Sequence, residues 1–69
     1  MQRIRLVKPS KADVRKAIRK WSKNGLYEFA DILLIYENHT SVQFEYDEEK
    51  LSFAYDSHSP VAIVFIEIY

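Results

Sequence analysis

Two histidines and two nearby carboxylates are the side chains in this sequence best suited to binding a metal ion. Glu37 and His39 belong to one predicted turn and Asp56 and His58 to another, and both turns are expected at the same end of a sheet. Imidazole and carboxylate groups are common metal ligands. Their spacing matches no defined metal site, however, and histidines in turns are usually solvated. We therefore predict no metal site and no cofactor.

The segment Asp56-Ser57-His58-Ser59 contains the residue types of a hydrolase triad. Neighbours in one turn cannot converge as nucleophile, base and orienting acid beside an oxyanion hole. The single glycine, Gly25, follows a predicted helix and belongs to no phosphate-binding loop. The sequence has no cysteine, which excludes disulfides and Cys-based zinc sites. We predict that the protein is not an enzyme.

Basic residues are the remaining functional candidates, because they are concentrated in one part of the chain. Residues 1–23 contain nine Lys or Arg and one acidic residue, a net charge of +8, whereas residues 24–69 contain nine acidic residues and one lysine, a net charge of −8. Lys and Arg side chains bind nucleic-acid phosphates by releasing counterions. The predicted phosphate-binding residues are Arg3, Arg5, Lys11, Arg15, Lys16, Arg19, Lys20 and Lys23.

Two functions fit this charge pattern. The first is a non-catalytic module that contacts the DNA or RNA backbone without reading bases, because no helix-turn-helix, RNA-recognition or zinc-finger motif accompanies the basic residues. The alternative is a protein–protein interaction module, such as a small inhibitor or regulator of a larger protein. The acidic residues of segment 47–49 are expected to form an ordinary exposed turn.

The basic residues belong to two predicted elements, a strand at residues 2–8 and a helix at residues 10–24. Ser10 and Asp13 resemble a capping box at the start of the helix. The apolar residues of this segment recur at helical spacing, and a glycine follows as the stop signal. They are Val14, Ala17, Ile18 and Trp21.

The next segment has two interpretations. Leu26, Phe29 and Leu33 fit the spacing of a second helix over residues 26–37, whereas the apolar run 32–36 fits a strand that is buried on both faces. We favour a strand at residues 31–37, because alternating strand patterns follow it. The second helix remains the alternative.

The alternating patterns predict strands at 42–46 and 51–55 joined by a turn at 47–50. In this hairpin, Tyr46 would lie opposite Leu51, Phe44 opposite Phe53, and Val42 opposite Tyr55. A last strand follows at 61–68. The sequence therefore predicts one α+β domain over residues 1–69, with a single helix packed on an antiparallel four- to five-stranded sheet in the order β-α-β-β-β-β.

One predicted core lies between the helix and the sheet. Its members are Ile4, Leu6, Val14, Ile18, Trp21, Val42, Phe44, Tyr46, Leu51, Phe53, Tyr55, Val64 and Ile66. The strand at 2–8 is expected to cover the edge of the last strand, with Arg3 and Arg5 near Glu67.

The last strand leaves apolar residues on the outer face of the sheet, beside Ile32 or Leu34. Such a patch usually marks an interface, and we predict a homodimer through Val61, Ile63 and Phe65. No segment resembles a signal peptide or approaches the roughly 18 apolar residues of a membrane span. We therefore expect a cytoplasmic protein that does not bind a membrane.

Overall fold

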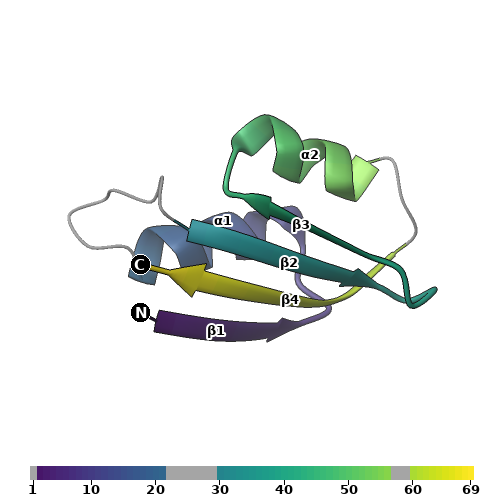
Figure 1. Ribbon diagram of the computed structural model, residues 1–69, viewed down its shortest axis with the longest axis horizontal. Helices are drawn as coiled ribbons and strands as arrows, with labels where there is room; N and C mark the ends of the chain where they lie inside the picture. The colour runs from purple at the N-terminus through teal and green to yellow at the C-terminus, as the bar shows by residue number, and fades with distance from the viewer. Residues whose placement is uncertain (1, 22–29, 57–59) are drawn as a thin grey trace.

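The computed structural model describes residues 2–21, 30–56 and 60–69, which form an antiparallel sheet and two helices (Figure 1). The strands are β1 (Gln2–Val7), β2 (Ala30–Tyr36), β3 (Ser41–Glu45) and β4 (Val61–Ile68). The helices are α1 (Lys11–Trp21) and α2 (Glu48–Asp56). The predicted α+β class is confirmed, whereas the prediction of a single helix is wrong.

The strand order across the sheet is β1-β4-β2-β3, and every neighbouring pair is antiparallel. β1 and β2 therefore run in the same direction with β4 between them, and β3 and β4 run in the same direction with β2 between them. α1 follows β1 and α2 follows β3 along the chain, which gives two interlocked β-α-β units. β1 and β3 are the edge strands.

Both helices pack on the same face of the sheet. Val14 and Ile18 of α1 and Leu51 and Ala54 of α2 join one core cluster with alternate residues of the strands. Those strand residues are Ala30, Ile32, Leu34 and Tyr36 of β2 and Val64, Ile66 and Ile68 of β4. We call the opposite face of the sheet, which is turned toward the viewer in Figure 1, the open face.

α1 begins with the predicted capping box. The Ser10 N–H donates to Asp13 Oδ2 at 2.9 Å, and the Asp13 N–H donates to Ser10 Oγ at 3.1 Å. Val14 and Ile18 are fully buried, as predicted. Trp21 is 44% exposed, so its predicted core position is wrong. It occupies the last turn of α1 beside edge strand β1, where the sheet covers only part of the indole.

The predicted strand at 51–55 is instead helix α2. The Asp47 carboxylate accepts the N–H groups of Glu49 and Lys50 at 2.8 and 3.1 Å, which caps the helix, and the acidic first turn complements the helix dipole. The predicted turn at 47–50 is therefore the start of a helix. Helical geometry turns Leu51 inward and leaves Phe53 65% exposed, so the predicted core position of Phe53 is wrong.

The predicted hairpin between 42–46 and 51–55 is also wrong, because β3 pairs with β2. Phe44 lies opposite Ile32 and Val42 opposite Leu34. Over Ala30–Tyr36 the chain is a strand, which confirms the favoured interpretation and excludes a second helix there; residues 26–29 lie outside the described residues.

β1 covers one edge of β4, as predicted, with Arg3 opposite Glu67. The other edge of β4 is paired with β2. The six-residue apolar run of β4 is therefore not an exposed sheet edge, because both sides of its backbone are hydrogen-bonded within the chain.

The remaining predicted core residues lie in or against the core. Leu51, Val64 and Ile66 are fully buried. The half-buried ones that pack against the cluster are Ile4, Leu6, Val42, Phe44, Tyr46 and Tyr55. The core residues missed by the prediction are Ala30, Ile32, Leu34, Tyr36 and Ala54.

Candidate functional site

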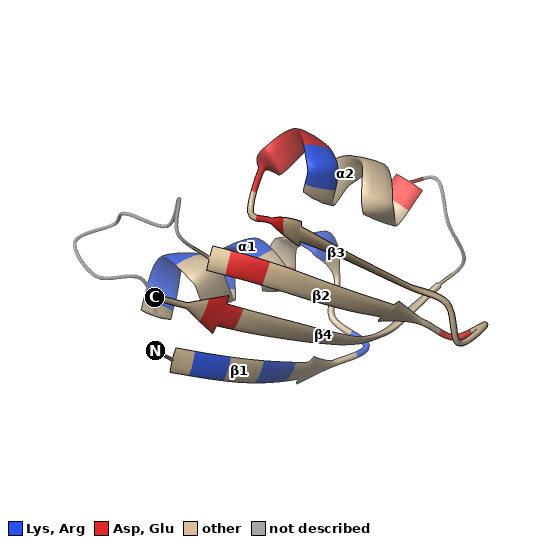
Figure 2. Ribbon diagram, in the orientation of Figure 1, with Lys and Arg blue, Asp and Glu red and all other residues tan. Residues whose placement is uncertain are grey.

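The predicted phosphate-binding residues are distributed over several surfaces (Figure 2). Lys11 and Arg15 face α2: Lys11 Nζ lies 3.9 Å from Asp56 Oδ1 and 3.4 Å from Ser52 Oγ, and Arg15 pairs with Glu48. These two cations therefore have anionic partners within the chain.

Glu48 is the centre of this contact between the helices. Its carboxylate accepts hydrogen bonds from Arg15 and from the Tyr46 hydroxyl, the latter at 2.8 Å. The Arg15 side chain, with a smaller contribution from Tyr46, lowers the pKa of Glu48 from its ordinary value. The charge of Glu48 is thus used to hold α2 against α1 and the end of β3.

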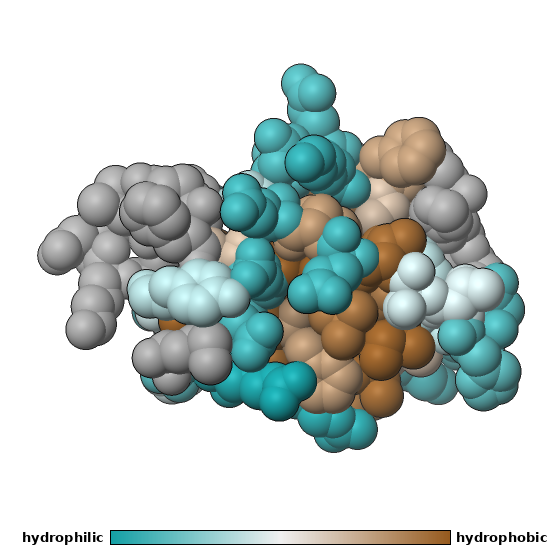
Figure 3. All heavy atoms as spheres, in the orientation of Figure 1, coloured by the Kyte–Doolittle hydropathy of each residue, from teal (hydrophilic) through white to brown (hydrophobic). Residues whose placement is uncertain are grey.

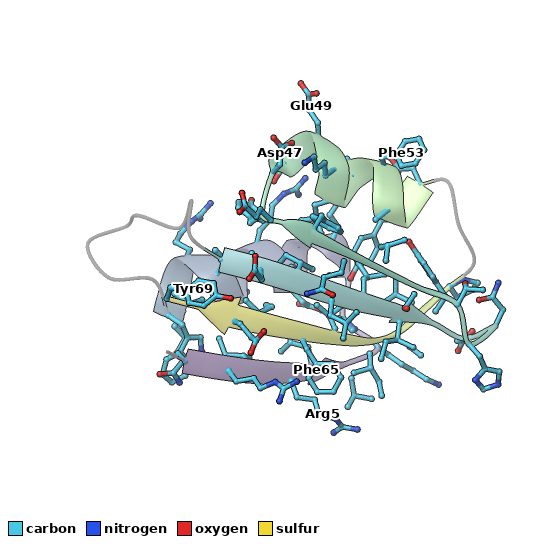
Figure 4. The ribbon with its side chains drawn as sticks, viewed as in Figure 1. Arg5, Asp47, Glu49, Phe53, Phe65 and Tyr69 are labelled. Carbon is cyan, nitrogen blue, oxygen red and sulfur yellow. The ribbon has the colours of Figure 1, made fainter. Side chains whose placement is uncertain are left out.

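Arg3 and Arg5 lie on the open face of β1, away from the helices. The Arg3 guanidinium lies 5.2 Å from the centroid of the Phe65 ring, and Arg5 lies opposite Phe65 in the strand register. Figure 4 shows Arg5 and Phe65 together at the β1 side of the sheet.

Lys16 and Lys20 lie on the flank of α1 that faces edge strand β1. They border a groove between helix and strand whose lining residues are Ile4, Leu6, Val7, Pro9, Asp13, Lys16, Ala17, Lys20 and Trp21. Lys20 Nζ lies 5.4 Å from the centroid of the Trp21 ring. Arg19 belongs to the last turn of the same helix, and Lys23 lies outside the described residues.

The outer backbone of β1 borders this groove. Lys8 N–H donates to Ala62 C=O at 2.8 Å, and the register repeats this bonded pairing at Leu6 and Ile4. Residues between bonded pairs point their N–H and C=O groups away from the neighbouring strand. The outward residues are therefore Arg3, Arg5 and Val7. Among the described residues, no strand pairs with this outer side of β1.

These features together form a surface that we call the basic edge. It combines an outward strand backbone, an apolar groove and cationic side chains on both faces of the strand. Its residues are Arg3, Arg5, Val7, Lys16, Lys20 and Trp21.

The opposite side of the sheet has the same construction with the opposite charge. Tyr36 N–H donates to Thr40 C=O at 2.8 Å and Tyr46 N–H to Ala30 C=O at 2.7 Å, so the outward backbone groups of β3 are those of Ser41, Gln43 and Glu45. A second groove lies between β3 and α2, and it is lined by Val42, Phe44, Glu49, Lys50, Phe53 and Ala54.

We call this surface the acidic edge, and its residues are Ser41, Gln43, Glu45, Glu49 and Phe53. Figure 4 shows Asp47, Glu49 and Phe53 around α2, across the sheet from Arg5. The two edges therefore stand at opposite ends of the strand order.

The open face between the two edges has an apolar and an acidic part. Ile63, Phe65, Leu33 and Ile35 occupy adjacent positions on β4 and β2. Figure 3 shows a brown, hydrophobic area on this side of the molecule. The prediction that Ile32 or Leu34 lies beside these outer residues is wrong, since both side chains are buried in the core. Val61 packs against the core cluster, because a register shift near Tyr36 turns it toward the helices. The homodimer through this face stays a prediction.

A row of three carboxylates crosses the same face. Glu67 lies opposite Asp31, and Asp31 lies opposite Glu45, with Arg3 at the β1 end of the row. The Tyr69 hydroxyl donates a hydrogen bond to Asp31, and this bond raises the pKa of Tyr69. Like charges on neighbouring strands repel, so a cation beyond Glu45 would be stabilised.

The candidate metal ligands do not gather into a site among the residues that the structure describes. Glu37 and His39 lie at the turn after β2, Asp56 lies near Lys11, and His58 falls outside the described residues. No group of three or more potential ligands is found within residues 2–21, 30–56 and 60–69. Neither described helix is long and apolar enough to cross a membrane.

Comparison with known proteins gives no family. No protein-family model matches the chain, and no curated protein or solved structure is significantly similar to it.

Sequence reasoning found the charges of the basic edge but missed the acidic edge as a surface. The signal that could have identified α2 is Asp47 followed by Glu48 and Glu49, an N-cap with an acidic first turn. Nothing local in the sequence indicates that β1 and β3 lie at opposite edges.

Proposed function

We propose that this protein is a non-catalytic interaction module that binds an extended, acidic protein segment as an added strand along its basic edge. The observation that carries this proposal is the outward backbone of Arg3, Arg5 and Val7 beside an apolar groove with lysines on its rim. Strand addition obtains affinity from backbone hydrogen bonds and specificity from pockets for alternate side chains.

The two faces of the edge favour acidic side chains on an added strand. Side chains that point to the open face would meet Arg3 and Arg5, whereas those that point to the helices would enter the groove near Lys16 and Lys20. Charged residues on an edge strand discourage indiscriminate pairing. Here they also select the charge of the strand that pairs.

The apolar floor of the groove supports a protein ligand. Ile4 and Leu6 are half-buried there, and Trp21 presents a partly exposed ring beside them. An added strand places every second side chain over this floor, and burial of such a side chain is favourable. Phosphate binding makes no use of an apolar groove.

Nucleic-acid binding stays a prediction. The ion pairs of Lys11 and Arg15 with α2, and the position of Arg3 and Arg5 on the other face of the sheet, divide the cations that it would combine. This division favours the protein-interaction alternative.

A fluorescence anisotropy titration tests the proposal with a labelled peptide of alternating Glu and Val. We expect saturable binding that weakens at least about fivefold in Arg5→Glu, because that substitution places a like charge opposite the peptide's glutamates on the open face. Lys50→Glu is the matched control: it makes the same charge change on α2, and binding should persist.

Two further ligands separate backbone pairing from simple charge attraction. The same peptide with N-methylated backbone positions keeps its charge but cannot pair along β1, and it should not bind. Single-stranded DNA is the second ligand. Equal binding of the methylated peptide, or binding of DNA with none of the peptide, would overturn the proposal.

A further inference from the structure

We propose that the occupant of the basic edge is the acidic edge of a second copy of this chain, so that copies join head to tail into one continuous antiparallel sheet. This inference rests on the proposed function and names its partner. It uses the two sheet edges, and therefore a different surface from the predicted dimer interface on the open face.

Strand direction permits this junction. β1 is antiparallel to β4, β4 to β2, and β2 to β3, so β1 and β3 run in opposite directions. A second copy in the same orientation, placed beside β3, presents its own β1 antiparallel to that strand. Its helices then lie on the same face of the extended sheet as the helices of the first copy.

The outward backbone groups of the two edge strands can also pair with each other, because in both strands they belong to the residues whose side chains lie on the same face. Those of β1 belong to Arg3, Arg5 and Val7, and those of β3 belong to Ser41, Gln43 and Glu45. In both sets the side chains lie on the open face. Two such sets can form hydrogen-bonded antiparallel pairs, and the core-facing side chains of both copies then stay on the same side of the joined sheet.

The register that continues the existing rows has a favourable charge pattern. It places Glu45 opposite Arg3 of the second copy, and Gln43 opposite Arg5 of the second copy. The row of Glu67, Asp31 and Glu45 then ends on a cation instead of on solvent. Opposite charges in directly opposed cross-strand positions stabilise a sheet, while like charges destabilise it.

The helix-covered side of the junction is apolar in both copies. The groove beside β3 is lined by Phe44 and Phe53, and the groove beside β1 is lined by Leu6 and Trp21. At the junction the two grooves would become one, and Glu49 of one copy would supply a carboxylate to the rim that carries Lys16 and Lys20 of the other. The exposed rings of Phe53 and Trp21 would thereby gain apolar cover.

Pairing between identical edges lacks this charge complementarity. In the fully overlapping antiparallel register, two β1 edges would place Arg5 opposite Arg5, whereas two β3 edges would place Gln43 opposite Gln43 and Glu45 opposite Ser41. The favoured contact is therefore heterologous, which produces open chains or closed rings and not a two-fold dimer.

Charge-reversal variants test this junction by sedimentation velocity over a range of protein concentrations at low salt. The unmodified protein should form species larger than a dimer, and the sedimentation coefficient should rise with concentration. Arg3→Glu and Glu45→Arg should each sediment as monomers, because each places like charges at the junction. An equimolar mixture of the two variants should assemble again, as should the double variant.

Glu37→Arg is the matched control, since it makes the same charge change at a turn outside both edges, and assembly should persist. Circular dichroism of each variant verifies the fold. A monomer at all concentrations would overturn this inference, while peptide binding by that monomer would leave the proposed function standing. A closed dimer that is lost in Phe65→Asp but not in Arg3→Glu would also overturn it, in favour of the open face.

Discussion

The two edges of the sheet are built alike and carry opposite charges. Each has a strand with an outward backbone, a helix beside it and an apolar groove between them. Cations border the groove at β1, whereas carboxylates prevail at β3 (Figure 2). The total charge of the chain is zero, but the fold converts a division of charge along the sequence into a division of charge across the sheet.

The edges differ in how their helices are held. α1 lies over the sheet and buries Val14 and Ile18. α2 buries Leu51 and Ala54 and receives a 2.8 Å hydrogen bond from the buried Tyr36 hydroxyl at the carbonyl of Ala54. The groove of the acidic edge therefore depends on the few contacts that hold α2 on the sheet. A substitution at these contacts can disrupt this groove while leaving β1 unchanged.

The largest expected effect comes from Leu51→Ala, which removes the main apolar anchor of α2. Truncation of a fully buried leucine costs about 2–5 kcal/mol. Phe53→Ala on the same helix should change stability by only about 0.5 kcal/mol, because surface substitutions usually have small effects. Urea denaturation measures both. Equal losses in the two variants would contradict the orientation of α2.

A smaller effect is expected from Tyr55, which links the two sides of the molecule. Its hydroxyl donates to the carbonyl of Pro9 at 2.9 Å, and burial raises the pKa of Tyr55 from 10.0 to about 12, with lesser contributions from Asp13 and Tyr36. A raised folded-state pKa means that the stabilisation is complete below pH 10 and is lost as the pH rises toward 12.

The expected alkaline loss from Tyr55 is about 1 kcal/mol after allowance for partial exposure. Thermal unfolding between neutral pH and pH 12 measures it, with absorbance at the tyrosinate band to follow ionisation. In Tyr55→Phe this part of the alkaline loss should be absent. An identical alkaline profile in the variant would show that Tyr55 does not connect α2 to the start of α1.

The smallest effect concerns the contact between the helices through Arg15 and Glu48. The pKa of Glu48 is lowered by Arg15 from its ordinary value of 4.5, so the contact stabilises the fold above that pH and is lost as the pH falls through the lower folded value. A double-mutant cycle with Arg15→Gln and Glu48→Gln measures the coupling by urea midpoint. We expect a small coupling at neutral pH that is reduced by salt and abolished in acid.

Local signals predicted the basic side of the molecule well. The Ser10–Asp13 capping box and the apolar spacing of Val14 and Ile18 predicted α1, because both depend on residues within one or two turns. The alternation of Ile4 and Leu6 likewise predicted β1.

The acidic side was misjudged because its local signals conflict. Leu51, Phe53 and Tyr55 alternate as in a strand, yet Leu51 and Ala54 have helical spacing, and the cap at Asp47 decides the outcome. The apolar run 32–36 of β2 gave no indication of which face is buried. The position of the two edges follows from pairings between distant segments, which no local pattern encodes.

The central position of β4 has a consequence for how the sheet comes into being. β4 follows every other strand in the sequence, yet it pairs with β1 on one side and with β2 on the other. During synthesis, β1 therefore has no neighbour in the sheet until residues 61–68 have left the ribosome. Such long-range pairing slows folding, because chain entropy must be lost before the contacts form. The nascent chain thus displays its basic segment before β1 becomes an edge strand of the sheet.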